Sequence, residues 1–436
     1  MRNTILLGDV RQTLAQVPAG TVQCCVTSPP YWNLRSYLDA SHPDKPLEIG
    51  SEPTIEAYIE TLVGVFRECR RVLRDDGTLW LNCGDSYDAN GSKLGMPWRL
   101  AFALQADGWL LRDEIIWAKP SPMPSSQNGW RWERCRIKAK NGAPQAPEFQ
   151  TGRLKDHSGD IRNTDAAEWI PCPGCPKCLP HGGLVLRRAK WRTTTAHEPI
   201  FMFAKSEGYF CDPWASKESA VGDAPGNKRH KGAEAYANGD EHHRTKVGLT
   251  NVEAVKYRTA RSVWKISTEP TKLKHFACFP SELARRCIIA GSSPQACSKC
   301  GAPYAPLLRQ ERVPTRPGVN NKIWKGVDAN GNGQRSDDSP NLDPERHVLE
   351  ISCDGYLPSC GCKAEPGRCV VLDPFSGTST TCQVARHFGR DWIGCEINSV
   401  YAEMGLKKIN ETPACVKRLQ KKKPPPKQSN QMEMFT

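Results

Sequence analysis

The feature that most constrains the fold is an apolar segment near the carboxyl end that runs directly into a loop of small residues. Cys369–Leu372 is expected to be a buried strand, and a helix is expected over Ser379–Phe388. Between them lies the loop Asp373-Pro374-Phe375-Ser376-Gly377-Thr378. Small residues let a backbone approach a ligand closely, and the N–H groups at the start of a helix attract negative groups. This segment predicts a cofactor site in an α/β sheet.

The next expected strand supports a nucleotide-type cofactor. Trp392–Cys395 is apolar and ends in Glu396, and Asn398 follows two residues later. An acidic side chain that closes the second strand can accept hydrogen bonds from ribose hydroxyls. Strand, loop, helix, strand and acid in this order are much more specific than a glycine-rich loop alone.

A second motif lies near the amino end, where the expected strand Val22–Thr27 runs into Ser28-Pro29-Pro30-Tyr31 and then Trp32. Proline has no N–H, so the ladder stops and the backbone leaves the sheet at its carboxyl edge, where open α/β sheets bind ligands. Carbonyl acceptors beside aromatic rings suit an amino group on a planar base. The hexapeptide alone is equally compatible with a Pro-Pro turn and packed aromatic side chains.

The rest of the chain alternates short β-rich runs with segments of helical periodicity, which predicts an α/β fold with a largely parallel sheet. Further strands are expected over Thr4–Leu7, Thr78–Asn82, Asp113–Ala118 and His197–Ala204, and further helices over Ile55–Leu73, Trp98–Gln105, Pro280–Ala290 and Tyr401–Ile409.

Two groups among the twenty cysteines have the spacing of zinc ligands. Cys172, Cys175 and Cys178 form one group, and its fourth ligand is Cys135 or His181, with Cys135 preferred. The second group joins two pairs across a long loop: Cys297, Cys300, Cys360 and Cys362, with Cys353 as a competitor. Clusters of exposed thiols are a liability, which favours two structural Zn²⁺ sites.

The chain carries a formal net charge of +13, which favours a polyanionic partner such as nucleic acid. Ser121–Arg192 combines many arginines and tryptophans with the first cysteine group, a mixture suited to phosphate and base contacts. The alternative is a solvated basic loop. No apolar run approaches the length of a membrane span, and the sequence favours a cytoplasmic protein.

These motifs together resemble the circularly permuted (beta-group) DNA amino-methyltransferases, in which the catalytic Ser-Pro-Pro-Tyr motif precedes the target-recognition region and the cofactor loop comes last. The resemblance covers most of the chain outside the insertions. It also rests on these shorter matches: Gly8-Asp9, Gly77–Asn82, Trp117-Ala118-Lys119-Pro120, His197-Glu198, Lys205-Ser206 with Tyr209, and the helix from Phe279-Pro280.

The resemblance implies a Rossmann-like, doubly wound, mostly parallel sheet with zinc-stapled insertions. It implies an enzyme that uses S-adenosyl-L-methionine to methylate the exocyclic amino group of a base extruded from double-stranded DNA. The catalytic residues would be Ser28, Pro29, Pro30 and Tyr31. The cofactor would be held by Asp9, Pro280, Asp373, Pro374, Phe375, Ser376, Gly377, Thr378, Glu396 and Asn398.

Serine before Pro-Pro, as in the resembling enzymes, leans toward cytosine N4 as the methylated atom. Adenine N6, RNA or protein as substrate, and a non-catalytic zinc-ribbon DNA-binding protein are the alternatives. A cognate restriction enzyme is a further candidate partner. One departure concerns the loop, because the family usually has a second glycine where this chain has Ser379. A positive φ there would strain the loop, but we expect it to accept a small residue.

The expected organisation follows from these assignments. The catalytic half spans 1–120, a zinc-containing target-recognition insertion 121–196, the continued core 197–293 with a mobile loop at 217–258, a zinc-ribbon-like insertion 294–368, the cofactor-binding half 369–411 and a disordered basic tail 412–436.

Overall fold

The computed structural model describes residues 1–88, 90–122, 129–138, 153–155, 161–163, 169–219, 257–269, 279–314 and 347–413. They form two compact units, one of Met1–Pro120 with His197–Thr436 and one of Ser121–Ala196. Three expected regions lie wholly or partly outside the described residues. They are most of the expected mobile loop (220–256), the middle of the zinc-ribbon-like insertion (315–346) and the tail from residue 414. Within the described stretches, every helix is too short or too polar to cross a bilayer.

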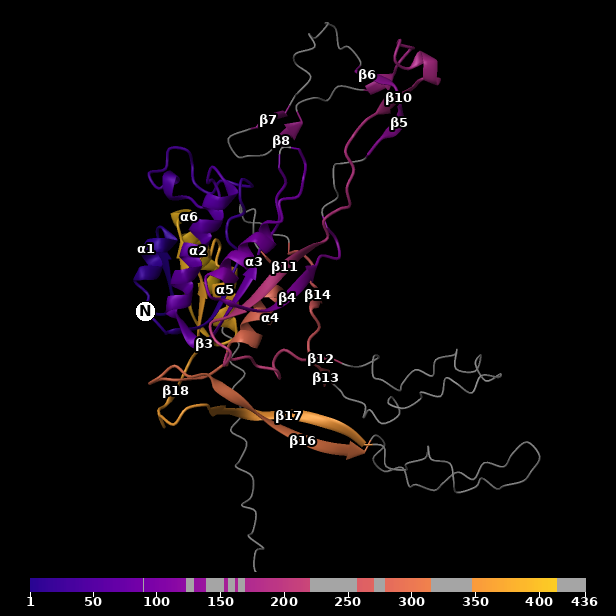
Figure 1. Ribbon diagram of the computed structural model, residues 1–436. Coiled ribbons are helices and arrows are strands. Elements are labelled where there is room, and N and C mark those ends of the chain that lie inside the picture. The colour runs from indigo at the N-terminus through magenta and orange to yellow at the C-terminus, as the bar shows by residue number, and fades with distance from the viewer. Residues whose placement is uncertain are drawn as a thin grey trace, which may run out of the picture. The chain divides into compact units, whose positions relative to one another are not determined.

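The first unit is built on an eight-stranded sheet, as far as the chain is described. Its spatial order is β1 (Thr4–Leu7), β20 (Asp391–Glu396), β19 (Val370–Asp373), β2 (Val22–Thr27), β3 (Leu73–Asn82), β11 (His197–Ala204), β4 (Leu110–Ala118) and β14 (Val263–Lys265). Among these strands only β11 runs antiparallel to its neighbours. The predicted mostly parallel α/β sheet is confirmed (Figure 1).

The two ends of the sequence interleave within this sheet. The carboxyl-terminal strand β20 pairs with β1, and β19 pairs with β2, with Val371 opposite Cys24. Strands from residues 370–396 therefore fill the place between the first two strands of the chain. This arrangement joins the two motif-bearing halves into one sheet, as the permuted motif order requires, although permutation itself stays a prediction.

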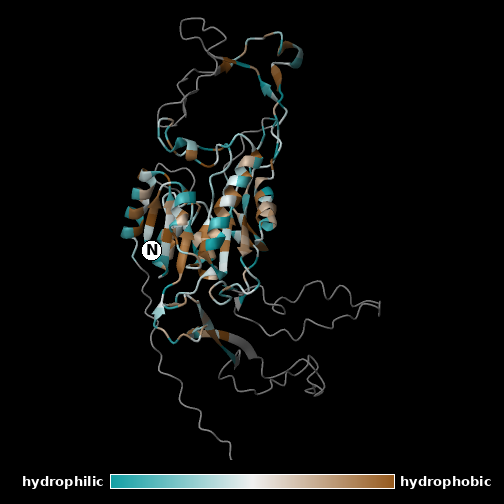
Figure 2. Ribbon diagram, turned by 60° about the vertical axis from the view of Figure 1, so that its left-hand side comes forward, coloured by the Kyte–Doolittle hydropathy of each residue, from teal (hydrophilic) through white to brown (hydrophobic). Residues whose placement is uncertain are grey.

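Helices cover both faces of the sheet, and each face has its own apolar cluster (Figure 2). One face packs against α1 (Val10–Ala15), α2 (Ile55–Val72) and α3 (Met96–Ala106). The other packs against α4 (Ser281–Gly291), α5 (Thr380–His387) and α6 (Ser399–Glu411). Side chains that alternate along each strand feed the two clusters in turn, as on a sheet buried on both sides.

Three elements differ from the sequence prediction. The helix α2 ends at Val72, and β3 begins at Leu73, so Asp75–Gly77 belongs to the strand and does not follow a helix end. The reason is that Leu73 is fully buried and already pairs with Val22 of β2. The sequence does not predict α1 or β14, which have only six and three residues. Elements this short carry almost no periodic signal.

The insertion before β19 contains a long hairpin that the sequence reading also missed. Its strands are β16 (Tyr304–Pro314) and β17 (His347–Pro358), and beside it β15 (Ala296–Cys297) pairs with β18 (Pro366–Gly367). The Tyr356 hydroxyl donates a 2.6 Å hydrogen bond to the fully buried Asp212, which ties the hairpin to the core. Two further short elements are the pair β12 (Glu218–Ser219) with β13 (Tyr257–Arg258) and the 3₁₀ turn η1 (Lys45–Leu47).

The second unit consists of short antiparallel pairs. They are β5 (Arg131–Arg134) with β10 (Leu184–Arg187), β6 (Arg136–Lys138) with β9 (Trp169–Pro171), and β7 (Arg153–Lys155) with β8 (Ile161–Asn163), together with the 3₁₀ turn η3 (Leu179–His181). Strand pairs this small have little core of their own. A crosslink is therefore expected in this unit.

Candidate active site

The two sequence motifs meet at one edge of the sheet because β2 and β19 are parallel neighbours. Their carboxyl ends carry Ser28-Pro29-Pro30-Tyr31 and the loop that follows Asp373. The buried Thr27 hydroxyl donates a 2.7 Å hydrogen bond to Asp373 Oδ1. The Thr381 hydroxyl, at the start of α5, donates to the carbonyl of Val26 at 3.2 Å. Side-chain hydrogen bonds therefore join the two halves of the site directly.

The loop after β19 is shaped by the two carboxylates at its ends. Asp373 Oδ1 accepts from the backbone N–H of Phe375 at 3.1 Å. Glu396, at the end of β20, accepts from the backbone N–H groups of Gly377 (2.7 Å) and Asn398 (2.9 Å). The loop is thus held against the ends of both strands, with Glu396 at its mouth.

Burial shapes the electrostatics of both carboxyl groups. It raises the pKa of Asp373 to about 6, although the Thr27 hydroxyl acts in the opposite direction. It raises the pKa of Glu396 to about 7 against the two backbone donors. Burial disfavours the ionised form of both groups. Hydrogen-bond donors such as hydroxyl groups would stabilise that ionised form.

Ser379, in the position of the family's second glycine, has a φ of +61°. The loop does require the left-handed conformation there, and the chain adopts it with a serine. The Ser379 hydroxyl is buried and, within the described residues, has no hydrogen-bond partner. It packs on Gly405 of α6, where an added Cβ would come within 2.4 Å of its oxygen. Glycine at 405 therefore makes room for serine at 379.

The turn after β2 is fixed from outside the motif. The Tyr58 hydroxyl, on α2, donates to the carbonyl of Pro30 at 2.7 Å, and Trp32 Nε1 donates to the carbonyl of Glu52 at 2.9 Å. A Cβ added to Gly50 would lie 3.3 Å from Cβ of Pro30, so these two residues pack closely. The Pro30 carbonyl is thus used to hold the turn.

Neighbouring residues fix both the ring and the hydroxyl of Tyr31. A Cβ on Gly84 would lie 2.3 Å from ring atom Cε2, so glycine is needed behind the ring. The hydroxyl of Ser28 donates to Tyr31 Oη at 3.3 Å, and the Tyr31 hydroxyl donates to Glu198 Oε2 at 3.1 Å. Burial, followed by the charge of Glu198, raises the pKa of Tyr31 well above its ordinary value, so this phenol remains protonated.

Three polar residues surround Ser28 and Tyr31. They lie in segments that match the resembling family, but the resemblance assigns them no role. Glu198 is the second residue of β11, Asn82 is the last residue of β3, and Lys119 directly follows β4. Lys119 Nζ forms an ion pair with Glu198 Oε1. Asn82 Nδ2 donates to Glu198 Oε2 at 3.3 Å. No spacing in the sequence links these three residues, because the antiparallel pairing of β11 with β3 and β4 brings them together.

The remaining predicted cofactor residues also border this edge. Asp9 caps α1, and its carboxylate accepts from the backbone N–H (2.8 Å) and Nε (2.9 Å) of Arg11. The neighbouring Gly8 N–H donates to the carbonyl of Glu396 at 2.8 Å. Asn398 caps α6, accepting from Val400 N–H at 2.9 Å. Pro280 caps α4 on the second face.

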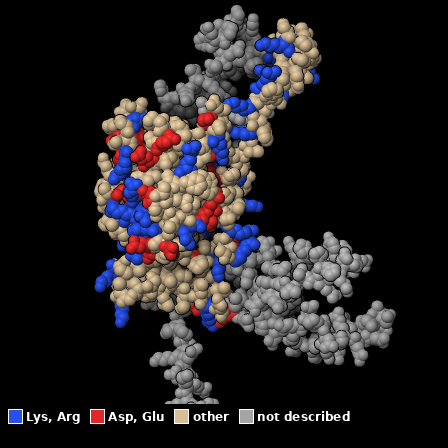
Figure 3. Space-filling view, in the orientation of Figure 1, with Lys and Arg blue, Asp and Glu red and all other residues tan. Residues whose placement is uncertain are grey.

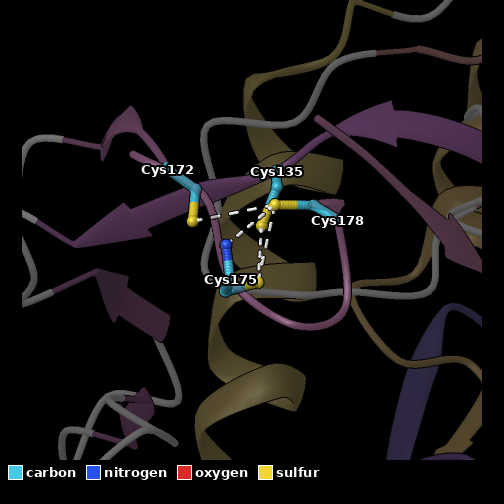
Figure 4. A group of neighbouring side chains, drawn as sticks. All are labelled: Cys135, Cys172, Cys175 and Cys178. Carbon is cyan, nitrogen blue, oxygen red and sulfur yellow. Dashed lines mark hydrogen bonds between the residues drawn. The ribbon is translucent and has the colours of Figure 1, made fainter. Parts of the chain in front are cut away.

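The first cysteine group gathers in the second unit (Figure 4). Cys175 Sγ lies 3.9 Å from Cys135 Sγ and 3.6 Å from Cys178 Sγ, and Cys178 Sγ lies 4.0 Å from Cys172 Sγ. Backbone N–H groups, first that of Lys177, lower the pKa of Cys175 to about 7. His181, the alternative fourth ligand, instead packs against Trp132 with the ring centroids 4.6 Å apart and the rings tilted by 56°.

The second cysteine group gathers beside the hairpin of the first unit. The sulfur atoms of Cys297, Cys300, Cys360 and Cys362 lie within 4.8 Å of one another. A backbone hydrogen bond from Cys300 lowers the pKa of Cys297 to about 6. The competitor Cys353 donates to the carbonyl of Gly355 at 3.2 Å. Four sulfur atoms this close together, one of them on a thiol with a lowered pKa, form a donor set suited to Zn²⁺.

Comparison with known proteins identifies relatives across most of the chain. The DNA methylase family of N6 and N4 methyltransferases matches residues 22–297 and 339–407. The Type II methyltransferase M.XycI of Xanthomonas campestris pv. cyanopsidis is 32% identical over 320 residues, covering 67% of this chain and 73% of that protein. The Type II methyltransferase M.SmaI of Serratia marcescens is 30% identical over 318 residues, covering 66% and 75%.

Solved structures also align with this chain. The cytosine-N4-specific PvuII DNA methyltransferase aligns with a TM-score of 0.43 at 13% identity, covering 94% of this chain and 91% of that one.

Proposed function

As a member of the DNA methylase family of N6 and N4 methyltransferases, this chain is a DNA methyltransferase, and we propose that it methylates cytosine N4 with S-adenosyl-L-methionine as donor. The observation that supports a shared site is the 2.7 Å hydrogen bond between Thr27 and Asp373, and the choice of cytosine rests on the serine before Pro-Pro. It links the residues before the Ser-Pro-Pro-Tyr turn to the first residue of the small-residue loop. A methyl donor held by that loop would face a base held by the turn.

The residues at the loop fit such a donor by their chemistry. Glu396 is a buried carboxylate whose pKa is raised by burial, so ribose hydroxyls would satisfy it. The backbone of the loop would hold the rest of the cofactor, through these residues: Asp373, Pro374, Phe375, Ser376, Gly377 and Thr378. Asn398 and Pro280 would border the site. Asp9 would contact the adenine, although its carboxylate already binds Arg11. When bound, the cofactor supplies an activated sulfonium methyl group.

The turn would prepare the base amino group for attack. The exocyclic nitrogen is a weak nucleophile because its lone pair is delocalised into the ring. Hydrogen bonds from its N–H groups to the Ser28 hydroxyl and the Pro29 carbonyl, both out of the ring plane, would favour a pyramidal nitrogen. Tyr31 would stack on the base. The protein would then mainly orient donor and acceptor in line.

A base inside a duplex cannot reach this edge, so it must be extruded. Extrusion costs a few kcal/mol, and stacking on an aromatic ring returns about 1–3 kcal/mol. Gly84 keeps the space that Tyr31 occupies, because any Cβ there would collide with the ring.

The test is to incubate the protein with methyl-labelled S-adenosyl-L-methionine and unmethylated plasmid DNA. The DNA is then digested to nucleosides and analysed by mass spectrometry. We expect N4-methylcytosine, with loss of transfer in Ser28→Ala. N6-methyladenine would identify the other base of this family and overturn the cytosine assignment. DNA binding without label would mean a non-catalytic protein, and label on RNA or protein alone would mean another substrate.

We assign one structural Zn²⁺ to each cysteine group. In the first unit the ion would hold the two ends of the hairpin insertion together. In the second unit it would crosslink strand pairs that have little apolar core. Elemental analysis of the purified protein should give two zinc ions per chain. Cys175→Ser and Cys300→Ser should each remove one, and retention of both ions in either variant would contradict the assignment.

The second unit is the proposed target-recognition insertion. Its stretches 129–138 and 169–196 contain a single acidic residue, Glu133, and many basic ones, as follows: Arg131, Arg134, Arg136, Lys138, Lys177, Arg187, Arg188, Lys190 and Arg192. Lys and Arg side chains are prominent on the face of this unit drawn in Figure 3. Trp130 and Trp191 are 67% and 70% exposed, and Arg188 stacks on Trp130 at 5.0 Å. Basic side chains contact phosphates, and exposed aromatic rings contact bases.

The name Type II given to the relatives suggests a cognate restriction enzyme as partner. Such an enzyme would cut the sequence that this methyltransferase protects. Sequencing DNA from cells that express this chain would identify that sequence.

A further inference from the structure

A chain of hydrogen bonds runs from Lys119 to the catalytic serine. It passes from Lys119 to Glu198, from Glu198 to Tyr31 and from Tyr31 to Ser28. Glu198 and Lys119 are both largely buried, with 19% and 18% of their side chains exposed. This chain lies at the same edge of the sheet as the cofactor loop, but the mechanism above uses only its last two members.

The direction of every hydrogen bond in the chain follows from the carboxylate. Glu198 can only accept, and Lys119 donates to its Oε1. The Tyr31 hydroxyl lies 3.1 Å from Oε2 and 3.5 Å from Asn82 Oδ1, and the shorter contact with the charged carboxylate directs its proton to Glu198. Its oxygen is then an acceptor, and the Ser28 hydroxyl, 3.3 Å away, points its proton at Tyr31.

We propose that Glu198 is a positioning residue that fixes the Ser28 hydroxyl as a pure hydrogen-bond acceptor for the base amino group. This inference rests on the proposed function, in which Ser28 receives an N–H of the base. Once its proton is committed to Tyr31, Ser28 Oγ presents only lone pairs on its other side. A freely rotating hydroxyl would direct its proton at the base nitrogen part of the time and bind the lone pair that must attack.

The substitution Glu198→Gln should reverse the chain without changing its shape. Lys119 has only donors and will take the amide oxygen of glutamine. The amide NH₂ then faces Tyr31 and Asn82. We expect the Asn82 amide, which now donates to Glu198, to turn its oxygen toward this NH₂ group, so that the Tyr31 hydroxyl accepts from the NH₂ group and donates to Ser28. Ser28 becomes an acceptor toward Tyr31 and turns its proton toward the base. Tyr31→Phe instead removes the connection and leaves the Ser28 hydroxyl free to rotate.

A double-mutant cycle separates this mechanism from a direct contact. Methyl transfer to plasmid DNA is measured for the wild type, Glu198→Gln, Tyr31→Phe and the double variant. We expect Glu198→Gln alone to lower kcat by about tenfold to a hundredfold, the loss typical of a mispositioned reacting group. In the Tyr31→Phe background the same change should alter kcat by less than about twofold, because the connection no longer exists.

The controls separate positioning from damage to the fold. The Kd for S-adenosyl-L-methionine and the Tm should stay at wild-type values in Glu198→Gln. Glu207→Gln, at an exposed glutamate beyond the far end of β11, should change none of these quantities.

Two outcomes would overturn the inference: losses that multiply in the double variant, or an unchanged kcat in Glu198→Gln. In either case the loss of activity in Ser28→Ala would still support the proposed function. Full activity of Ser28→Ala would instead remove the proposed role of the serine itself.

Discussion

At the scale of single residues, the site contains several groups held in states that other surroundings would not favour. Ser379 has a left-handed backbone and a buried hydroxyl that finds no hydrogen-bond partner in the part of the chain that the structure describes. Glu396 and Asp373 are buried carboxyl groups with raised pKa values. Gly84 leaves no room for a Cβ beside the Tyr31 ring. Each of these states can be tested by one substitution.

The first prediction concerns Ser379. A serine in the left-handed region costs about 1–2 kcal/mol, and glycine removes that cost but gains freedom in the unfolded chain. We expect Ser379→Gly to increase the free energy of unfolding by about 0.5–1 kcal/mol, measured by urea denaturation. Ser379→Ala keeps the backbone strain and serves as control. A glycine variant no more stable than the alanine variant would contradict this account.

The second prediction concerns pH. The pKa of Glu396 is raised in the folded protein to about 7, so the folded state binds this proton more tightly than the unfolded state. Its contribution to stability is fully present below the unfolded pKa and is lost as the pH rises through about 7. The Tm of the wild type should therefore fall more steeply between pH 5 and pH 8 than the Tm of Glu396→Gln.

The cofactor should show the opposite pH dependence, because ribose hydroxyls bind the ionised carboxylate. Binding of S-adenosyl-L-methionine should tighten as the pH rises through about 7. This dependence should be flatter in Glu396→Gln. Parallel pH profiles of the wild type and variant, in Tm or in Kd, would exclude Glu396 as the titrating group.

The third prediction concerns Gly84. A Cβ at this position would lie 2.3 Å from Cε2 and 2.9 Å from Cζ of Tyr31, so Gly84→Ala must displace the ring. We expect kcat to fall by about tenfold to a hundredfold while the Kd for the cofactor is unchanged. Gly64→Ala, in α2 with open space around it, is the matched control and should keep full activity. Equal activity of the two variants would show that the ring position is unimportant.

At the scale of elements, the insertion that carries the second cysteine group is connected to the strands that carry the active site. Gln23, on β2, donates to the carbonyl of Gly301 beside Cys300 at 2.8 Å and accepts from Val370 N–H, at the start of β19, at 2.6 Å. One buried side chain thus bridges the cysteine group and both motif-bearing strands. The cysteine group lies at the ends of these strands opposite the site.

The fourth prediction follows from this bridge. Gln23→Leu leaves the buried Val370 N–H and the Gly301 carbonyl unpaired, which costs about 1–3 kcal/mol for each buried group. We expect a lower Tm, and we expect zinc removal by a chelator to lower the Tm of the wild type more than that of Gln23→Leu. The measurement is calorimetry with and without chelator. Equal shifts in the two proteins would show that the metal group is independent of the core.

The elements were predictable to different degrees, for physical reasons. The strands β1, β2 and β11 match their expected ranges because their apolar runs are bounded by polar or turn residues. The same applies, within two residues at each end, to α4, α5 and α6. The hairpin of β16 and β17 could not be found, because its strands join across a long insertion and carry many polar residues.

The site was predictable where one segment of sequence carries it. The turn at Ser28 and the loop from Asp373 to Thr378 are each local motifs, so their meeting required only two adjacent strands. The support of Tyr31 by Glu198, Asn82, Lys119 and Gly84 depends on strand order and register, which no local pattern encodes. The fourth thiol of the first group, Cys135, lies 37 residues before Cys172 and was preferred only slightly over His181.

At the scale of the whole molecule, the interleaved sheet has a consequence for synthesis. When residues 1–120 have left the ribosome, β1 and β2 are present, but the two strands that lie between them, β19 and β20, begin only at residues 370 and 391. Pairings between such distant segments form slowly and late. A nascent chain that has not reached β19 therefore has neither a complete sheet nor the loop after Asp373, and we expect it to transfer no methyl group to DNA.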